Sequence, residues 1–368
     1  MKSQVFFQNT SPGNVMVDYQ KLLGHFPKPK NTPTIVKLNL SWTKFFPAVS
    51  TPPWHFQAIL QWLTDAGVSP KNIIPVENRT VVTKVEVGAR NHAWTKVAKK
   101  FGVKIHYLTK EKYFNYRPRA KMLVLDKIFP EGIYLPQVLV DKPLVSLCTL
   151  KAHVFTTMTG AIKNYFGMLT TKRHYCHRYI HQAIIDLLQI QKELHPQIYA
   201  VMDGSVVGFG SGPRAMQWKE ANLLFGSSDE VALDATAARI MGFKPREIEF
   251  LKLGQKLNLG YLDQKSIQII GTKKLPNLNV GIKRDTFASR GQKFIYGRLP
   301  EWVEKLLLHT FIAPWSYAAS NLYHDVYWYN FVGKARLFRY LRSGWGKLFR
   351  SYFKSTISPI KKATARLG

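Results

Sequence analysis

The stretch TIVKLNLSWTKFFPAVSTPPWHFQAILQWLTDAGVSPKNIIPVE, residues 34–77, contains two apolar runs separated by one amphipathic segment. The runs at 34–40 and 72–77 are rich in β-branched residues, which is typical of buried strands. Between them, residues 50–67 begin with Ser, Thr and two prolines and end with glycine, as helices commonly do. The stretch therefore predicts a strand–helix–strand unit, and such units build parallel sheets through right-handed crossovers.

The alternation of strands and helices continues after this unit. A helix is expected at 91–102, where a glycine closes an amphipathic run, and a strand is expected at 103–108. Later segments predict strands at 121–126, 138–150, 197–204, 221–228 and 267–271, helices within 153–194 and 228–242, and a glycine-rich loop at 204–213. The expected fold is α/β, with a mainly parallel sheet, helices on both faces and a basic helical C-terminal extension.

Composition suggests four regions along the chain. They are a polar N-terminal arm at 1–32, the α/β core at 33–272, an aromatic-rich extension at 273–332, and a basic amphipathic helix with its tail at 333–368. In the last region, apolar side chains share one face of a helical wheel over 334–354 and basic side chains occupy the other. This helix could lie on an anionic membrane surface, or it could pack its apolar face on the core or on a partner.

The charge of the chain is strongly positive. Its 368 residues include 53 Lys and Arg against 22 Asp and Glu, a formal net charge of +31. This balance favours partners that carry negative charge, whether small molecules, membranes or nucleic acid. Nucleic acid is the least favoured of the three, because no recognition module appears and the basic residues outside the tail are dispersed.

Cysteine usage and hydropathy limit the class of protein. Cys148 and Cys176 are the two cysteines, so this chain alone cannot provide a four-cysteine iron–sulfur cluster or zinc site. We expect both thiols to be buried and reduced. The N-terminus lacks the apolar core of a signal peptide, and no clean run of about twenty apolar residues occurs. The expected location is the cytoplasm, with possible membrane association.

Cationic and amide side chains gather at the expected carboxyl ends of strands, where open α/β sheets bind ligands. The candidates for anion binding are Lys37, Asn39, Lys151, His153, Lys163 and Asn164. Lysine supplies charge and asparagine supplies oriented amide dipoles, so together they suit a carboxylate or phosphate. The simpler alternative is that strand ends carry lysines because they reach solvent.

Three histidines, His174, His177 and His181, have spacings that one helix would align on a single face. A metal site is one interpretation, but Arg173 and Arg178 would repel a cation there. We favour a single histidine, His153 or His174, as a general acid or base, and we assign no metal site.

Two further groups supply candidate carboxylates and glycines. Asp203-Gly204 ends an expected strand and precedes Gly212-Pro213, although an ordinary turn would have the same composition. This segment matches neither a dinucleotide fingerprint nor a P-loop. Asp229 and Asp234 lie near the start of an expected helix. We expect Asp203 or Asp234 to assist catalysis, and we assign Gly204, Gly212 and Asp229 to ligand binding.

The order of these motifs resembles the family named Domain of Unknown Function 362. The matching positions are Lys37 and Asn39, Lys151 and His153, Lys163, Asn164 and Gly167, His174 or His177, Asp203 and Gly204, Gly212 and Pro213, and Asp229, Val231, Ala232 and Asp234. The resemblance covers about 33–272 and implies a fold and a site but no reaction. Many members of the family carry an attached cysteine-rich ferredoxin-like segment, which this chain lacks. A redox role would therefore need a separate redox partner.

The main functional expectation is an enzyme or binding protein for an anionic small molecule. In this interpretation Lys37, Lys151 and Lys163 bind the anion and a histidine transfers a proton. A membrane-surface protein acting through 334–354 and a nucleic-acid-binding protein are the alternatives. The sequence identifies no cofactor.

Overall fold

The sheet at the centre of the molecule is mixed but mostly parallel. A computed structural model describes residues 2–80, 82–169, 171–281, 285–310 and 314–354. Its larger sheet has nine strands in the order β11-β1-β10-β9-β7-β2-β3-β4, with β8 paired to β7. The strands are β1 (Ser3–Asn9), β2 (Thr34–Lys37), β3 (Ile73–Glu77), β4 (His106–Tyr107), β7 (Leu144–His153), β8 (Thr157–Met158), β9 (Ile198–Ser211), β10 (Ala215–Ser227) and β11 (Ile267–Ile270). A short antiparallel pair, β5 (Tyr113–Tyr116) and β6 (Ile133–Pro136), lies apart from it.

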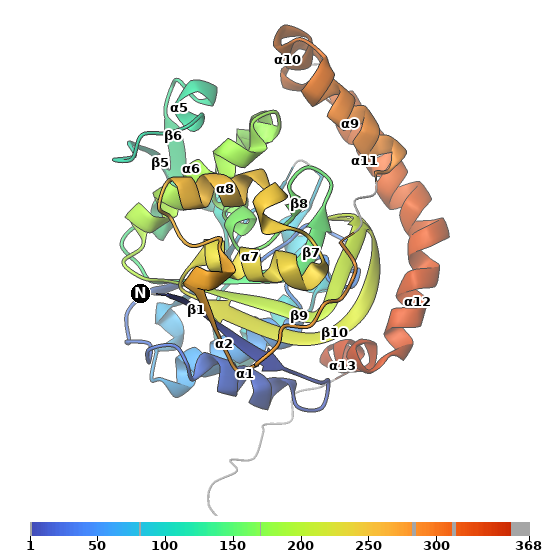
Figure 1. Ribbon diagram of the computed structural model, residues 1–368. Helices are drawn as coiled ribbons and strands as arrows, with labels where there is room; N and C mark the ends of the chain where they lie inside the picture. Colours follow the sequence, from blue (N-terminus) through green and yellow to red (C-terminus); the bar gives the residue numbers. More distant parts are fainter. Residues whose placement is uncertain (1, 81, 170, 282–284, 311–313, 355–368) are drawn as a thin grey trace, which may run out of the picture.

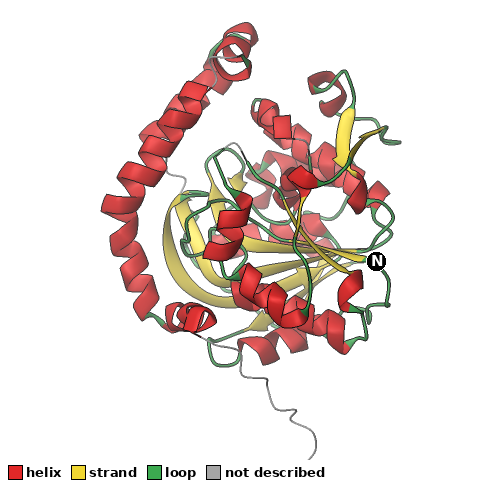
Figure 2. Cartoon of the chain, turned by 180° about the vertical axis from the view of Figure 1, so that it is seen from behind, coloured by secondary structure: helices red, strands yellow, loops and turns green. Residues whose placement is uncertain are grey.

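Helices cover both faces of the sheet, as the sequence predicts (Figures 1 and 2). The helices of one face are α1 (Val15–Leu23), α2 (Pro53–Asp65), the short α3 (Val85–Asn91) and α4 (Trp94–Phe101). The helices of the other face are α6 (Ile180–Leu194), α7 (Glu230–Met241) and α8 (Glu249–Lys256). Each layer buries its apolar stripe against the sheet, which gives two core clusters, one on either side.

The first thirty residues do not form the expected arm. Strand β1 is inserted between β10 and β11, antiparallel to the first and parallel to the second. Val5, Phe6 and Phe7 are buried there, and Tyr19 and Leu22 of α1 are also buried. The apolar run at 5–7 is short and has polar residues on both sides, so composition alone did not signal a core element.

Two other local expectations are wrong. Residues 121–126, expected as a strand, lead into the short helix α5 (Leu125–Ile128), because the carboxylate of Asp186 accepts hydrogen bonds from three successive backbone N–H groups at 123–125. The expected loop at 204–213 is largely strand: β9 continues to Ser211 and turns tightly into β10. Valine and phenylalanine between its glycines keep the alternation of a strand.

The expected helical region at 153–194 is only partly α-helical. Residues Ile162–Met168 and Thr171–His177 form two 3₁₀ segments, η4 and η5, before α6 begins at Ile180. The three histidines at 174, 177 and 181 therefore do not lie on one continuous α-helix.

The C-terminal extension is a chain of helices along one side of the core, in both ribbon views (Figures 1 and 2). It comprises α9 (Phe287–Arg298), α10 (Glu301–His309), α11 (Pro314–Asn321), the π-helix η8 (Leu322–Gly333), α12 (Lys334–Arg342) and α13 (Gly344–Lys354). The helix expected over 334–354 is thus two helices, with Ser343 extended between them. The end of the expected tail, 355–368, lies outside the described residues.

The apolar face of α12 and α13 packs on the protein itself. Tyr340, Trp345 and Phe349 are buried in the core cluster that contains α1 and α2. The ring of Trp345 lies 5.1 Å from that of Trp54, and its Nε1 donates to the side chain of Asn222 at 2.7 Å. The structure thus corresponds to the alternative in which this face packs on the core. Among the described helices, none is both long and apolar enough to cross a bilayer.

Candidate functional site

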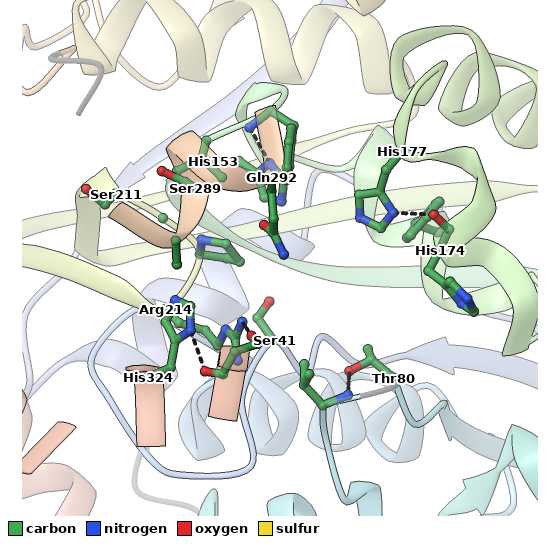
Figure 3. A pocket seen from close by; sticks show the side chains of 18 of the residues that line it. Ser41, Thr80, His153, His174, His177, Ser211, Arg214, Ser289, Gln292 and His324 are labelled. Carbon is green, nitrogen blue, oxygen red and sulfur yellow. Dashed lines mark hydrogen bonds between the residues drawn. The ribbon is translucent and has the colours of Figure 1, made fainter. Parts of the chain in front are cut away.

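A cavity of about 660 Å³ lies at the carboxyl edge of the sheet. Its floor comes from the residues at the ends of β2, β3 and β7 and from η4 and η5, and its outer wall comes from α9, α11 and η8. Figure 3 shows side chains from these distant segments directed toward the same space. The crossover topology explains this convergence, because parallel strands bring their carboxyl ends to one edge.

Three of the predicted residues form one hydrogen-bonded network beneath the cavity. Lys151 Nζ donates to Asn39 Oδ1 at 2.5 Å, and also to Val49 O at 2.6 Å and Thr149 Oγ1 at 2.9 Å. Asn39 Nδ2 donates to Asn164 Oδ1 at 3.1 Å. Asn164 Nδ2 in turn donates to the hydroxyl of Ser146 at 3.0 Å. Residues 39, 151 and 164 thus meet although 125 positions separate the first from the last.

Lys37 and Lys163 complete the cationic floor. Lys37 Nζ donates to both carboxylate oxygens of Glu77, at 3.0 and 3.1 Å, and both side chains are almost fully buried. Lys163 lines the cavity, with its Nζ 5.0 Å from the ring centre of Phe166. Lys37 and Lys163 therefore both line the cavity, and Lys151 lies below Asn39 without lining it.

The environment lowers the pKa of each of these lysines. Burial, followed by the charge of Lys163, lowers the pKa of Lys151 to about 7. Burial, followed by Arg173, lowers the pKa of Lys163 to about 8. Burial also lowers the pKa of Lys37, against the opposing effect of Glu77. Lys37 is thus paired with a carboxylate, whereas the hydrogen-bond partners of Lys151 are neutral oxygens.

Two histidines in the wall have defined tautomers. His153 Nδ1 faces the backbone N–H groups of Phe155 and Thr156 at 3.2 and 3.3 Å, so the neutral ring carries its hydrogen on Nε2. His177 Nδ1 donates to the carbonyl oxygen of His174 at 2.6 Å, which leaves the lone pair of the neutral ring on Nε2. Burial lowers the pKa of His177 to about 4 and that of His153 well below its usual value. Both rings are therefore neutral at pH 7, one with a donor and one with an acceptor at Nε2.

Arg214 is a cavity residue that the sequence reasoning missed. Its Nη2 donates to the hydroxyl of Ser320 at 2.8 Å, while its Nη1 is buried without a hydrogen-bond partner among the described residues. Burial lowers its pKa to about 10. The available signal was its position directly after Gly212-Pro213, since Gly212 was already assigned to ligand binding.

Position 212 requires glycine for a steric reason. A Cβ at this position would overlap the carbonyl oxygen of Ala152, so the hairpin turn approaches β7 as closely as backbone allows. Gly212 and Ser211 line the cavity beside His153. Gly204, in contrast, lies within the sheet under Phe225 and Leu223 and does not line it.

Asp203 and Asp234, which we expected to assist catalysis, do not line the cavity. Asp203 accepts hydrogen bonds from the Tyr19 hydroxyl at 2.7 Å, Trp54 Nε1 at 2.9 Å and Ser205, on the α1–α2 side. Asp234 accepts from the backbone N–H groups of 161 and 162 at 2.6 and 3.0 Å. Their oxygens are occupied by structural donors, so both carboxylates organise the fold around the site.

Asp229 is also structural. Its Oδ1 accepts from the N–H of Ala232 at 2.8 Å and so caps helix α7, and its Oδ2 accepts from the hydroxyl of Ser3 at 2.5 Å. It does not line the cavity.

His174 does line the cavity, next to His177. In the part of the chain that the structure describes, no three His, Cys, Asp or Glu side chains are grouped as metal ligands.

The fold and the site define an α/β protein with a cationic cavity at the carboxyl edge of a mostly parallel sheet. A family model described as Domain of unknown function (DUF362) matches residues 34–239, more than half of the chain, and the protein therefore belongs to this family. The match ends before the extension that forms the outer wall of the cavity. No curated protein is significantly similar to the chain.

Proposed function

We propose that the cavity binds a small molecule bearing a carboxylate or phosphate group and transfers a proton to or from it. The observation that carries this proposal is the buried Nη1 of Arg214 at the cavity wall, which has no hydrogen-bond partner within the part of the chain that the structure describes. A buried guanidinium donor without an acceptor is costly, and an anionic ligand would supply the acceptor.

The balance of charge in the lining supports the same proposal. Glu77 is the one carboxylate among the described lining residues, and Lys37 neutralises it. Lys163 and Arg214 are further positive groups in the lining. An anion of one or two charges would offset the repulsion between them.

The histidine pair suits proton transfer. His153 would donate a hydrogen bond from Nε2–H to a developing negative charge and keep its proton, and the lone pair on Nε2 of His177 would accept a proton from the ligand. The low pKa of both rings keeps them neutral, so neither forms a permanent ion pair with the ligand. In this role the two histidines are the catalytic residues and Lys163 holds the anion.

Anion binding to the full-length protein tests the proposal. Isothermal titration with inorganic phosphate and with acetate is expected to show saturable binding by at least one of them. Arg214→Met is expected to weaken it about tenfold or more, because a hydrogen bond to a charged group is worth about 1.5–3 kcal/mol. The matched control is Arg246→Met, which removes an exposed arginine paired with Asp263. Equal affinity in the Arg214 variant and the wild type would contradict the proposal.

A second candidate function is association with an anionic membrane surface. Among the described residues, eleven of the fifteen exposed large apolar side chains belong to 287–353. The segment 287–354 contains eleven Lys and Arg residues and three acidic residues. Each basic residue near such a surface contributes about 1 kcal/mol. Seven of these basic residues lie on α12 and α13, whose apolar face packs on the core, so their basic face would make the contact together with the exposed apolar side chains of α9, α10 and η8.

Vesicle sedimentation tests this second candidate. Full-length protein is expected to bind phosphatidylserine vesicles and to lose binding with Trp302→Glu and Phe331→Asp, whose side chains are 69% and 74% exposed. The control is Val17→Asp, an exposed position outside the extension. If Val17→Asp reduces vesicle binding as much as the substitutions in the extension do, the extension is not the membrane-binding surface.

A further inference from the structure

The two sides of the cavity differ in chemistry. Every charged side chain in the described lining comes from residues 37–214. The extension contributes aromatic and aliphatic side chains: Phe287, Ala288, Ile295, Tyr296, Leu308, Trp315, Ala319, Leu322, Tyr323 and Tyr327. This segregation is not a consequence of composition, because the segment 286–327 also contains Arg290, Lys293 and Lys305, and none of them lines the cavity.

Apart from Gln292, the Ser, Thr and His side chains that the extension places in the lining form hydrogen bonds within the protein. Ser289 closes the capping box of α9 with Thr286. Ser320 accepts the hydrogen bond from Arg214, and His324 Nδ1 donates to the carbonyl oxygen of Ser320 at 2.9 Å. Figure 3 shows Arg214 and His324 together on one side, away from His177 on the other. The outer wall therefore offers a ligand mainly apolar surface.

The volume of the cavity exceeds what a small anion needs. Cavities of roughly 300–1,000 Å³ accommodate drug-sized ligands, and this one measures about 660 Å³. A carboxylate or phosphate group bound at Lys163 and Arg214 would leave most of that space beside the aromatic wall. Apolar surface that is removed from water by a ligand contributes to affinity in proportion to its area.

We infer that the ligand is an amphiphilic anion, with its carboxylate or phosphate on the cationic floor and an apolar body, alkyl or aryl, against the extension. This inference rests on the proposed anion-binding function and specifies the class of molecule that the same cavity accepts. The extension is then the part of the chain that determines specificity for the apolar body, and the α/β core is the part that recognises the anionic group.

The docking of the extension on the core supports this division of roles. Arg178 forms an ion pair with Glu304 and donates to the carbonyl oxygen of Leu299 at 2.8 Å, which fixes α9 and α10 over the site. The ring of Tyr296 stacks on His177 at 5.5 Å and contacts Phe155 edge-on at 5.8 Å. An apolar body held against this wall lies directly beside the histidine proposed to accept a proton.

Binding of phosphate monoesters to the full-length protein tests the inference. Ethyl phosphate, octyl phosphate and phenyl phosphate share one head group, and titration below the micelle concentration compares an alkyl with an aryl body. Octyl or phenyl phosphate is expected to bind at least about tenfold more tightly than ethyl phosphate, the gain from burying about two methylene groups. Tighter binding of octyl phosphate would indicate an alkyl body, and tighter binding of phenyl phosphate would indicate an aryl body.

A pair of substitutions in one helix distinguishes the cavity from the outer surface. Leu322 lines the cavity and is 64% exposed, whereas Val326, one turn later in η8 and 53% exposed, does not line it. Leu322→Asp is expected to remove the preference for the longer body, and Val326→Asp is expected to leave it unchanged. Lys163→Met is expected to weaken binding of all three esters.

The outcomes separate the two proposals. If none of the esters binds, the anion-binding function itself fails. If all three bind equally and depend on Lys163, that function stands and the amphiphilic ligand is refuted. Preferential octyl phosphate binding that is abolished by Val326→Asp but not by Leu322→Asp would place the apolar body on the outer surface and would also refute the inference.

Discussion

Replacement of Asp234 should both destabilise the protein and disorder the floor of the cavity. Its two carboxylate oxygens accept the N–H groups of Ala161 and Ile162, at 2.6 and 3.0 Å, and all three residues are fully buried. These N–H groups begin the 3₁₀ segment that carries Lys163 and Asn164. Gly160 is pressed so closely against the carboxylate that a Cβ there would overlap it.

The expected loss in the free energy of unfolding follows from the two backbone N–H groups that lose their acceptor. Asp234→Ala leaves two buried N–H groups without acceptors, at about 1–3 kcal/mol each, so the free energy of unfolding should fall by about 2–6 kcal/mol. Asp234→Asn keeps one acceptor and should cost about half as much. Urea unfolding of both variants measures these values. Asp126→Asn is the control, because this exposed carboxylate accepts only from the neighbouring N–H of Lys127 and should change stability by no more than about 0.5 kcal/mol.

A functional readout distinguishes positioning from packing. If Asp234 positions 161–164, the asparagine variant should remain folded at 20 °C and bind phosphate more weakly than the wild type, since the register of Lys163 depends on the carboxylate. A cost below about 0.5 kcal/mol for Asp234→Ala would refute the structural role. Unchanged phosphate affinity in Asp234→Asn would show that Lys163 is positioned by other contacts.

Three further outcomes are expected. Trp345→Ala should lower the free energy of unfolding by about 3–5 kcal/mol in urea titration, because this ring is fully buried against Trp54; a cost under 1 kcal/mol would mean that α13 is detached in solution. Gly212→Ala should cost about 1–3 kcal/mol by overpacking against Ala152, and an unchanged melting temperature would contradict that close approach. The free energy of unfolding should fall as pH decreases from about 6.5 toward 4, because burial lowers the pKa of six histidines and the unfolded chain therefore binds protons that the folded chain does not. Each histidine contributes up to about 1.4 kcal/mol per pH unit. A flat profile between pH 6.5 and 4.5 would contradict this. These histidines are His55, His92, His153, His177, His195 and His324.

Strand–helix periodicity was sufficient to predict the parallel half of the sheet. The strands at 34–37 and 73–77 and the helix between them follow from residues 34–77 alone, since alternation and helix-terminal residues are local signals. Strand β1 could not be predicted in this way. Its partners are β10 and β11, more than two hundred residues later, so nothing near residues 3–9 in the sequence indicates what they pair with.

The same distinction applies to the site. Lysine and asparagine at strand ends were predictable because topology brings strand ends together, and the contact between Asn39 and Asn164 is one such case. The roles of the carboxylates were not predictable. Asp203 and Asp234 occupy positions that would suit catalysis, and only the coordinates show that tyrosine, tryptophan and backbone donors already occupy their oxygens.

Lys151 shows how a residue outside the cavity can still determine what the cavity binds. Its three partners are neutral oxygens, so its ammonium charge is hydrogen-bonded but not cancelled. One of those partners, Asn39, lines the cavity, which places this charge one side chain below the floor. In a region with little water a charge at that depth is weakly screened, and it raises the electrostatic potential where an anion would bind. Burial lowers the pKa of Lys151, and an anion bound above it would raise that pKa again by favouring the charged form.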